Sequence, residues 1–161
     1  MNDQRCFVRP RFVALAMGLM VPIGQAAFAQ NVEACYAETE IAYSVPTCIL
    51  RAIHDKESSG SLRKGIVNRN RDGSRDYGAM QHNDFWIRYF NRNFGITADQ
   101  FADNTCLSIR GAGYVLRYEI NRAGDFWKGV GRYHNPDPVL GYNYAVSIAQ
   151  RAEKFGCQIS R

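Results

Sequence analysis

The sequence lacks the patterns that mark several common classes of protein. It has no CxxC pair and no His/Cys pair at the spacing of zinc ligands, which argues against a zinc site. It has no internal repeat, low-complexity tract or linker, so its 161 residues predict one main domain. It has no block of Lys or Arg, so nucleic acid is not an expected partner. No serine or cysteine stands beside a placed base, so a nucleophilic triad is not indicated either.

A long apolar run is also missing. The N-terminal run at residues 12–21 has about ten residues, too few to span a bilayer. Three arginines precede it, and Ala27-Phe28-Ala29 follows with small residues at the two positions that signal peptidase reads. We therefore predict that residues 1–29 are a cleaved signal peptide and that residues 30–161 form a periplasmic or secreted domain with no stable membrane span. An uncleaved N-terminal anchor is the alternative.

Cleavage there removes three arginines and one aspartate, so the formal charge falls from +5 to +3. This mild positive charge weakly favours an anionic polymer such as a cell wall. Cleavage also removes Cys6 and leaves an even number of cysteines, which predicts two disulfides in an oxidising compartment. Spacing alone leaves three pairings open. The four remaining cysteines are Cys35, Cys48, Cys106 and Cys157.

Helical patterns dominate the rest of the chain, and one polar stretch interrupts them. The stretch 61–78 is rich in Asn, Asp and Gly and predicts an irregular loop or a small β-hairpin turning at Asp72-Gly73. The fold class is therefore mainly α, with a short loop or hairpin between helices. Helices are expected over residues 30–43, 45–58, 79–91, 105–123, 126–133 and 142–155, with a single turn at 97–101.

The same polar stretch resembles a calcium loop in part. Asn68, Asn70, Asp72 and Asp76 fall at ligand positions of an EF-hand-like spacing. Position twelve, where a bidentate Glu belongs, is Ala79. We therefore interpret the stretch as a tight Asx-type turn and predict no metal.

Glu57 continues an apolar stripe. Ile49, Ile53 and Glu57 recur at i, i+4 and i+8, and Gly60 follows where a glycine commonly ends a helix. Burial and the negative end of the helix dipole both disfavour the charged form and raise the pKa of a carboxyl. A carboxyl that stays protonated near neutral pH suits general acid catalysis. The alternative is a surface ion pair with Arg51 or Lys56.

Two further segments carry polar and aromatic groups suited to a sugar. Asp76 supplies a second carboxyl, and two carboxyls that flank a groove are typical of glycosidic bond cleavage. The segment 133–135, Tyr-His-Asn, can line a sugar groove by ring stacking and hydrogen bonds, or be a capped helix end with a half-buried tyrosine. His54 is interpreted as structural or solvent-facing, and Trp86 and Trp127 as core residues.

These pieces, in this order, resemble the catalytic domain of the soluble-lytic-transglycosylase family, from about Cys35 to Phe155. The family pattern is an apolar helix ending in Glu-Ser, an Asn/Asp/Gly loop, Gly-Leu-Met-Gln-Ile-Asn, a Gly-Ala helix, Ala-Tyr-Asn and a late Tyr-Ala pair. Here the matching segments are Glu57-Ser58, 70–76, Gly78-Ala79-Met80-Gln81-His82-Asn83, Gly111-Ala112-Gly113, Tyr133-His134-Asn135 and Tyr144-Ala145.

The resemblance implies a goose-lysozyme-like fold and cleavage of peptidoglycan glycan strands between MurNAc and GlcNAc, with a 1,6-anhydro product and no cofactor. It implies that Glu57 is the acid, with Asp76 in a supporting catalytic role. It also implies that Ser58, Met80, Gln81, Asn83, Tyr133 and Asn135 bind substrate or line the groove.

The short chain and the Asp-Gly-Ser-x-Asp loop are most similar to small exported members that accompany conjugation and type III or type IV secretion machines. Members of that branch carry a cysteine pair where Cys35 and Cys106 stand, which implies Cys35–Cys106 and leaves Cys48–Cys157. Three departures from the family pattern are Ala79 for Leu, His82 for Ile and His134 after the retained tyrosine. They bear on the shape of the substrate subsites.

Overall fold

The computed structural model describes the backbone of residues 23–159 and the side chains of residues 32–159. The predicted signal peptide lies outside the described residues as far as residue 22, and its cleavage stays a prediction. The structure confirms the predicted class, a mainly α lysozyme-like domain with a small β region between helices. Its helices are α1 (Ile23–Tyr43), α2 (Thr47–Ser58), α3 (Asp84–Phe94), α4 (Ala98–Asp103), α5 (Thr105–Ala123), α6 (Phe126–His134) and α7 (Pro138–Lys154). None of the helices in this described part is long and apolar enough to cross a membrane.

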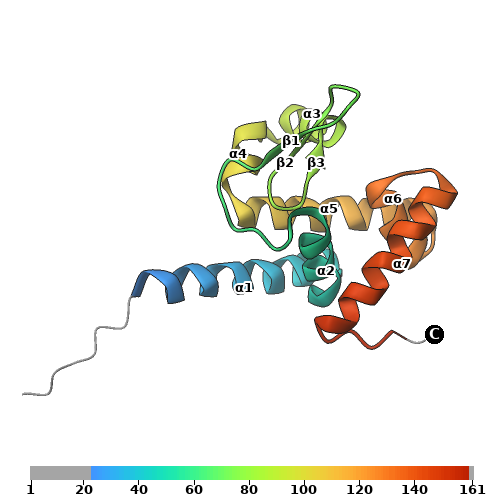
Figure 1. Ribbon diagram of the computed structural model, residues 1–161, viewed down its shortest axis with the longest axis horizontal. Helices are drawn as coiled ribbons and strands as arrows, with labels where there is room; N and C mark the ends of the chain where they lie inside the picture. Colours follow the sequence, from blue (N-terminus) through green and yellow to red (C-terminus); the bar gives the residue numbers. More distant parts are fainter. Residues whose placement is uncertain (1–22, 160–161) are drawn as a thin grey trace, which may run out of the picture.

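Helix α5 runs through the middle of the molecule and organises the core. It packs against α1, α2, α4 and α6, while α2 also packs against α7 (Figure 1). Of the apolar residues expected to form its core face, Ala112, Val115, Leu116 and Ile120 are buried, while Leu107 is half-buried. Two glycines let neighbours approach closely: a Cβ on Gly113 would lie 2.3 Å from Cγ2 of Thr39 in α1, so only glycine fits there.

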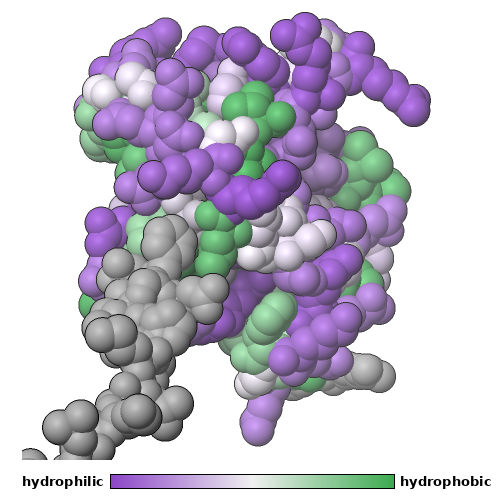
Figure 2. Space-filling view, turned by 60° about the vertical axis from the view of Figure 1, so that its left-hand side comes forward, coloured by the Kyte–Doolittle hydropathy of each residue, from purple (hydrophilic) through white to green (hydrophobic). Residues whose placement is uncertain are grey.

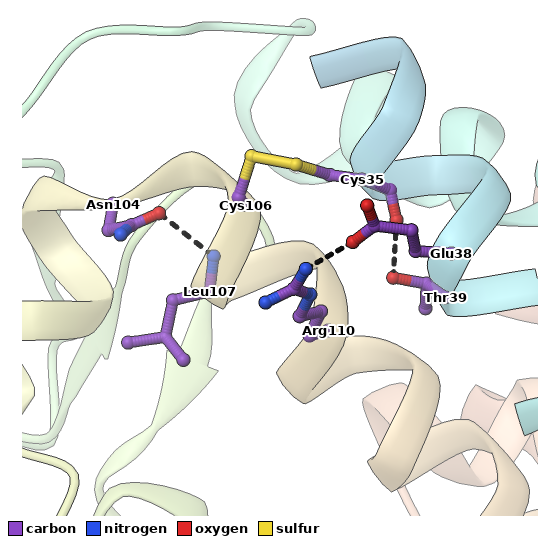
Figure 3. A network of polar contacts seen from close by, with 7 residues as sticks. All are labelled: Cys35, Glu38, Thr39, Asn104, Cys106, Leu107 and Arg110. Atoms are coloured by element: carbon purple, nitrogen blue, oxygen red, sulfur yellow. Dashed lines mark hydrogen bonds and ion pairs between the residues drawn. A yellow bond between two sulfur atoms is a disulfide. The ribbon is translucent and has the colours of Figure 1, made fainter. Parts of the chain in front are cut away.

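Two disulfides tie the helices together. Cys35 in α1 bonds Cys106 in α5, and Cys48 in α2 bonds Cys157 after α7, which is the pairing that the resemblance implies. Figure 3 shows the first of them beside an ion pair between Arg110 and Glu38, which joins the same two helices. The bonds close separations of 71 and 109 residues. Crosslinks of this kind typically contribute roughly 2–4 kcal/mol by restricting the unfolded chain.

The polar stretch forms an antiparallel sheet of three short strands, in the order β1 (Val67–Arg69), β2 (Arg75–Tyr77) and β3 (His82–Asn83). The first two pair with Asn68 opposite Asp76 and turn at the predicted Asp72-Gly73. Together with α3 and α4, the strands form the upper part of the molecule (Figure 1). On the face shown in Figure 2, this upper part is covered largely by hydrophilic residues.

Three predicted helix starts are wrong. The helix expected from residue 30 begins at Ile23. The helix expected from Ala79 begins at Asp84 because the chain first makes a turn and a strand: Gly78 and Gln81 have positive φ angles of 76° and 52°, and Asn83 caps the new helix. The last helix begins at Pro138 rather than at Tyr142. Proline is tolerated at a first helical position, and the side chain of Asp137 accepts hydrogen bonds from the two backbone N–H groups that follow it.

Candidate active site

Glu57 lies at the C-terminal end of α2, as the apolar stripe predicts. Ile49 and Ile53 on the same face are buried, with 1% and 0% exposure. The helix ends at Ser58 because the next residue, Ser59, adopts a left-handed conformation with φ 55°, and Gly60 follows with φ 67°. The chain therefore turns away from the helix directly after Glu57 and leaves its side chain beside α7.

The side chain of Glu57 is half-buried and has one close partner. The phenol O–H of Tyr144, on α7, donates a hydrogen bond of 2.5 Å to Oε1 of Glu57. The alternative ion pair with Arg51 is not formed, since Arg51 pairs with Glu33 instead. Glu57 is therefore held by a neutral donor in a partly dry environment, not by a surface cation.

This environment raises the pKa of the Glu57 carboxyl. Burial is the main cause, because it penalises the charged form, and the negative charge of Asp76 acts in the same direction. The hydrogen bond from Tyr144 and the positive charge of Lys56 oppose the shift without cancelling it. A carboxyl with a raised pKa at the end of a helix can donate a proton to a bound substrate.

Asp76 lies on β2, half-buried, within electrostatic reach of Glu57. Its Oδ2 accepts a hydrogen bond of 2.9 Å from Nδ2 of Asn70 across the hairpin. The turn itself is of the predicted Asx type, since Oδ1 of Asp72 accepts from the backbone N–H and the hydroxyl of Ser74. Within residues 32–159, no group of three or more His, Cys, Asp or Glu side chains is placed to hold a metal ion.

The turn at residues 78–81 is anchored from three sides. The hydroxyl of Ser58 donates to the carbonyl of Ala79 at 2.8 Å, and the hydroxyl of Tyr133 donates to the carbonyl of Met80 at 2.8 Å. The backbone N–H of Met80 donates to the hydroxyl of Ser108 at 3.0 Å. The turn therefore joins α2, α5 and α6 beside the carboxyl.

Three residues expected to bind substrate or line the groove belong to this scaffold. The side chain of Met80 is fully buried, so the expectation that it lines the groove is not met. Ser58 bonds to backbone carbonyls and not to Glu57. Tyr133 is 9% exposed, and its hydroxyl is used by Met80. Burial and the nearby carboxylates raise the pKa of Tyr133 well above its usual value, so it stays a neutral donor.

The two predicted amides of the turn region also make local bonds. Gln81 donates from Nε2 to the carbonyl of Gly78 at 2.8 Å and accepts at Oε1 from Asn68 at 2.6 Å. Asn83 is exposed and uses Oδ1 to accept from the backbone N–H of Trp86 at 3.1 Å, which caps α3. Gln81 thus fixes the turn to β1, while Asn83 defines where α3 begins.

Asn135 borders a cavity that Glu57 does not line. Oδ1 of Asn135 accepts from the backbone N–H of Asp137 at 2.9 Å, and the cavity of about 700 Å³ lies between α6, α7 and the C-terminal segment. Trp127 and Tyr142 also line this cavity. The structure therefore brings Glu57, Asp76 and the turn together and places Asn135 at their margin.

Sequence reasoning missed Tyr144 as the partner of Glu57, and it placed His134 only within a possible groove segment. Tyr144 is buried and holds Glu57, and His134 stacks on the Tyr144 ring with centroids 4.7 Å apart and an interplanar angle of 8°. The Tyr144-Ala145 pair is part of the family resemblance, and its place on the buried face of α7 was the available signal. The hydrogen bond to Glu57 itself spans 87 residues and has no local sequence pattern.

His54, Trp86 and Trp127 pack in or against the core. His54 is buried, and its Nε2–H donates to the carbonyl of Ser61 at 3.0 Å while Nδ1 accepts from the hydroxyl of Tyr36 at 2.5 Å. Burial lowers the pKa of His54, so it stays neutral. Trp86 is a core residue as predicted, with 7% exposure, and Trp127 is half-buried.

Comparison with known proteins identifies several relatives of the chain. No family model matches it. It is 32% identical to Protein IpgF of Shigella flexneri over 124 residues, which cover 77% of this chain and 75% of that protein. The chain belongs to the IpgF family. It is also 35% identical over 100 residues to Protein IpgF of Shigella sonnei.

A second name occurs among the relatives of this family. Invasion protein IagB of Salmonella typhimurium is 30% identical to the chain over 100 residues, which cover 62% of the chain and 61% of that protein. The match to this relative therefore extends over less than two thirds of either chain. The names of these relatives state no reaction, so the chemistry must be argued from the site.

Proposed function

We propose that the protein is a peptidoglycan lytic transglycosylase that cleaves the β-1,4 bond between MurNAc and GlcNAc and leaves a 1,6-anhydro product. The observation that carries the proposal is Glu57: a half-buried carboxyl with a raised pKa, bonded at Oε1 by Tyr144. The resemblance to lytic transglycosylases rests on the same glutamate and on the segments around it.

In the first step, Glu57 donates its proton to the glycosidic oxygen, and the bond from this oxygen to the anomeric carbon breaks. Because Tyr144 donates to Oε1, that oxygen acts as an acceptor and the proton belongs on Oε2. The positive charge that develops at the anomeric carbon is covered by the substrate's own N-acetyl oxygen or by the carboxylate of Asp76. GlcNAc leaves with a neutral hydroxyl group, because its oxygen has taken the proton from Glu57.

In the second step, Glu57 acts as the base. Its carboxylate takes the proton from the 6-hydroxyl of the same MurNAc, and the freed oxygen attacks the anomeric carbon to close the 1,6-anhydro ring. One carboxyl can serve in both steps because its proton is returned at the end of the cycle. The hydrogen bond from Tyr144 stabilises the carboxylate between the two steps.

The turn at residues 78–81 supplies the rigid edge of the site. Ser58 and Tyr133 fix its carbonyls, and Gln81 is tied to the hairpin, so the edge is held in place before substrate binds. We assign substrate contacts to the exposed or half-buried polar groups near this edge, Asp76, Gln81 and Asn83. Asn135 is assigned to the margin, where a longer glycan strand would pass.

The cellular role we propose is local opening of the peptidoglycan layer for a secretion or conjugation machine, after export through a cleaved signal peptide to the periplasm. Two disulfides fit an oxidising compartment. The printed name "Invasion protein IagB" of one relative fits a role in invasion, in which such a machine would deliver proteins.

Digestion of purified peptidoglycan tests the proposed reaction. Wild type is expected to release 1,6-anhydro muropeptides, identified by mass, and Glu57→Gln is expected to lose at least about 1,000-fold of this activity because the amide cannot donate the proton. Glu33→Gln is the matched control. Glu33 is an exposed glutamate in a surface ion pair and its variant should keep full activity.

The products distinguish the two other functions that the site allows. Reducing-end muropeptides in place of anhydro products would show a muramidase that admits water at the same carboxyl. Release of no product, together with retained binding to the wall, would show an assembly factor without catalysis. Either result overturns the transglycosylase proposal, and the second would also leave the raised pKa of Glu57 without a catalytic use.

A further inference from the structure

The imidazole of His134 is the only ring stacked nearly parallel to Tyr144 at close range within the described residues. The two centroids are 4.7 Å apart and the planes differ by 8°, whereas Tyr133 lies 6.5 Å away at 23°. His134 ends α6, and Tyr144 lies on α7, so the stack joins the two helices. His134 as a whole is exposed, unlike the buried Tyr144. The ring therefore covers Tyr144 from the solvent side.

The same phenol is the donor that holds Glu57. Its hydrogen bond to Oε1 is 2.5 Å long, so a small tilt of the Tyr144 ring would break or lengthen it. Charged and titratable groups on four elements surround Glu57, His134 and Tyr144. The titratable and charged groups that face Glu57, His134 or Tyr144 are Lys56 on α2, Asp76 on β2, Tyr133 on α6 and Arg151 on α7.

We propose that His134 is a positioning residue of the acid: its ring clamps Tyr144 so that the phenol O–H stays on Oε1 of Glu57. The proposal rests on the proposed function in so far as Glu57 is the acid. His134 acts as an uncharged ring in this role. Burial and the charge of Lys56 lower its pKa, so it is neutral at pH 7, and an aromatic residue without a titrating nitrogen could replace it.

The first test measures the carboxyl directly and needs no substrate. The pKa of Glu57 is followed by carbon NMR in the full mature chain, with Glu57→Gln used to assign the signal. Tyr144→Phe is expected to raise the pKa of Glu57, because the hydrogen bond that favours the carboxylate is lost. His134→Ala should raise it in the same direction by a smaller amount, and His134→Phe should leave it near the wild-type value.

The second test is a double-mutant cycle on turnover. His134→Ala is expected to lower kcat about fivefold to tenfold with little change in KM, and His134→Phe should restore at least about half of the wild-type value. In the Tyr144→Phe background, His134→Ala should change kcat less than about twofold, since no phenol O–H is left to position. Tyr118→Ala, an exposed aromatic on α5 outside the site, is the control and should match wild type.

Several results would overturn the positioning role. They are an unchanged or lowered pKa of Glu57 in His134→Ala, an equal loss of turnover in the presence and absence of the Tyr144 hydroxyl, and a His134→Phe variant no better than His134→Ala. If wild type releases no glycan product at all, the proposed function fails, but the NMR titration still decides whether His134 positions Tyr144.

Discussion

The phenol of Tyr144 reaches Glu57 across 87 residues of sequence and donates a 2.5 Å hydrogen bond to its carboxyl. The contact joins α2 to α7, and the Cys48–Cys157 disulfide also ties α2 to the segment that follows α7. An acid held in this way needs the C-terminal helix in place. The fold and the proposed chemistry are therefore linked through one contact, and changes at the carboxyl should alter stability as well as turnover.

Replacing Glu57 by Gln should stabilise the protein at neutral and higher pH. The folded state holds this carboxyl with a pKa above its ordinary value of 4.5, so ionisation costs more in the folded than in the unfolded chain. Stability is therefore lost as pH rises through the raised pKa, and glutamine removes that loss. Urea unfolding at pH 8 should show a higher midpoint for Glu57→Gln, with the gain shrinking towards pH 4.

The matched control for this stability change is Glu33→Gln. Glu33 pairs with Arg51 at the surface, and such pairs contribute at most about 1 kcal/mol, so this variant should be equal to or slightly less stable than wild type at both pH values. A Glu57→Gln protein that unfolds more easily than wild type at pH 8 would show that the carboxylate stabilises the fold, contrary to the raised pKa.

Asp76→Asn should move the alkaline limb of the activity profile to lower pH. The charge of Asp76 helps to raise the pKa of Glu57, and the asparagine removes this charge while keeping an oxygen for Asn70. Glu57 would then lose its proton at a lower pH, and activity measured at pH 7 should fall. The measurement is kcat/KM for peptidoglycan release between pH 4 and pH 9.

The size of the loss of kcat/KM in Asp76→Asn at the pH optimum indicates the role of Asp76. A loss below about tenfold would fit a purely electrostatic neighbour, and a loss of about 100-fold or more would fit direct stabilisation of the charged anomeric centre. Asp99→Asn, an exposed aspartate in the first turn of α4, should leave the whole profile unchanged. An alkaline limb that stays in place in Asp76→Asn would contradict the electrostatic coupling.

The sequence predicts the helices and the half-buried position of Glu57 well because both depend on local periodicity. Ile49, Ile53 and Glu57 share one face of α2 whatever packs against them. Because Ile49 and Ile53 are buried, Glu57 must point towards the same interior side. The Asp72-Gly73 turn is local in the same sense, since its bonds join residues 70 to 74. These features needed no knowledge of the tertiary fold.

The parts that could not be predicted depend on contacts between distant segments. The family resemblance implies that Met80 lines the groove, but its side chain is buried and its backbone is bonded to Ser108 on α5 and Tyr133 on α6. The helix expected at Ala79 is replaced by a turn because the anchors on Ala79 and Met80 come from elsewhere in the chain. The partner of Glu57 was equally hidden, since nothing near residue 57 indicates residue 144.

Gly78→Ala should destabilise the protein far more than Gly73→Ala. Both glycines have positive φ, 76° and 86°, so an alanine is strained by about 1–2 kcal/mol at either position. At Gly78 the new Cβ would also lie 2.2 Å from the carbonyl oxygen of Phe101, whereas nothing lies within 4 Å at Gly73. We expect a loss of at least about 3 kcal/mol for Gly78→Ala in urea unfolding, because the backbone must shift.

Gly73→Ala serves as the control for backbone strain alone. Its loss should stay within about 2 kcal/mol, and its peptidoglycan activity should remain near wild type because the hairpin turn lies at the outer edge of the sheet. Equal losses in the two variants would mean that the turn at residues 78–81 yields readily, and the rigid edge assigned to the site would have to be abandoned.

His82→Ile should make stability less dependent on pH. His82 is buried, its Nε2–H donates to the carbonyl of Ser108 at 2.8 Å, and burial lowers its pKa to about 4 from an ordinary value of 6.5. The folded pKa lies below the unfolded one, so the stability that neutral His82 provides is complete above pH 6.5 and is lost as pH falls towards 4. The loss in wild type is on the order of 3 kcal/mol by proton linkage.

Isoleucine cannot titrate, and it is the residue that the family pattern carries at this position. Unfolding in urea at pH 7.5 and pH 4 should therefore show a large fall in the free energy of unfolding for wild type and a smaller one for His82→Ile. His54 also has a pKa lowered by burial, but it is present in both proteins and cancels in the comparison. Equal falls in the two proteins would show that His82 accepts a proton without loss of its buried place, and the low pKa would then be incorrect.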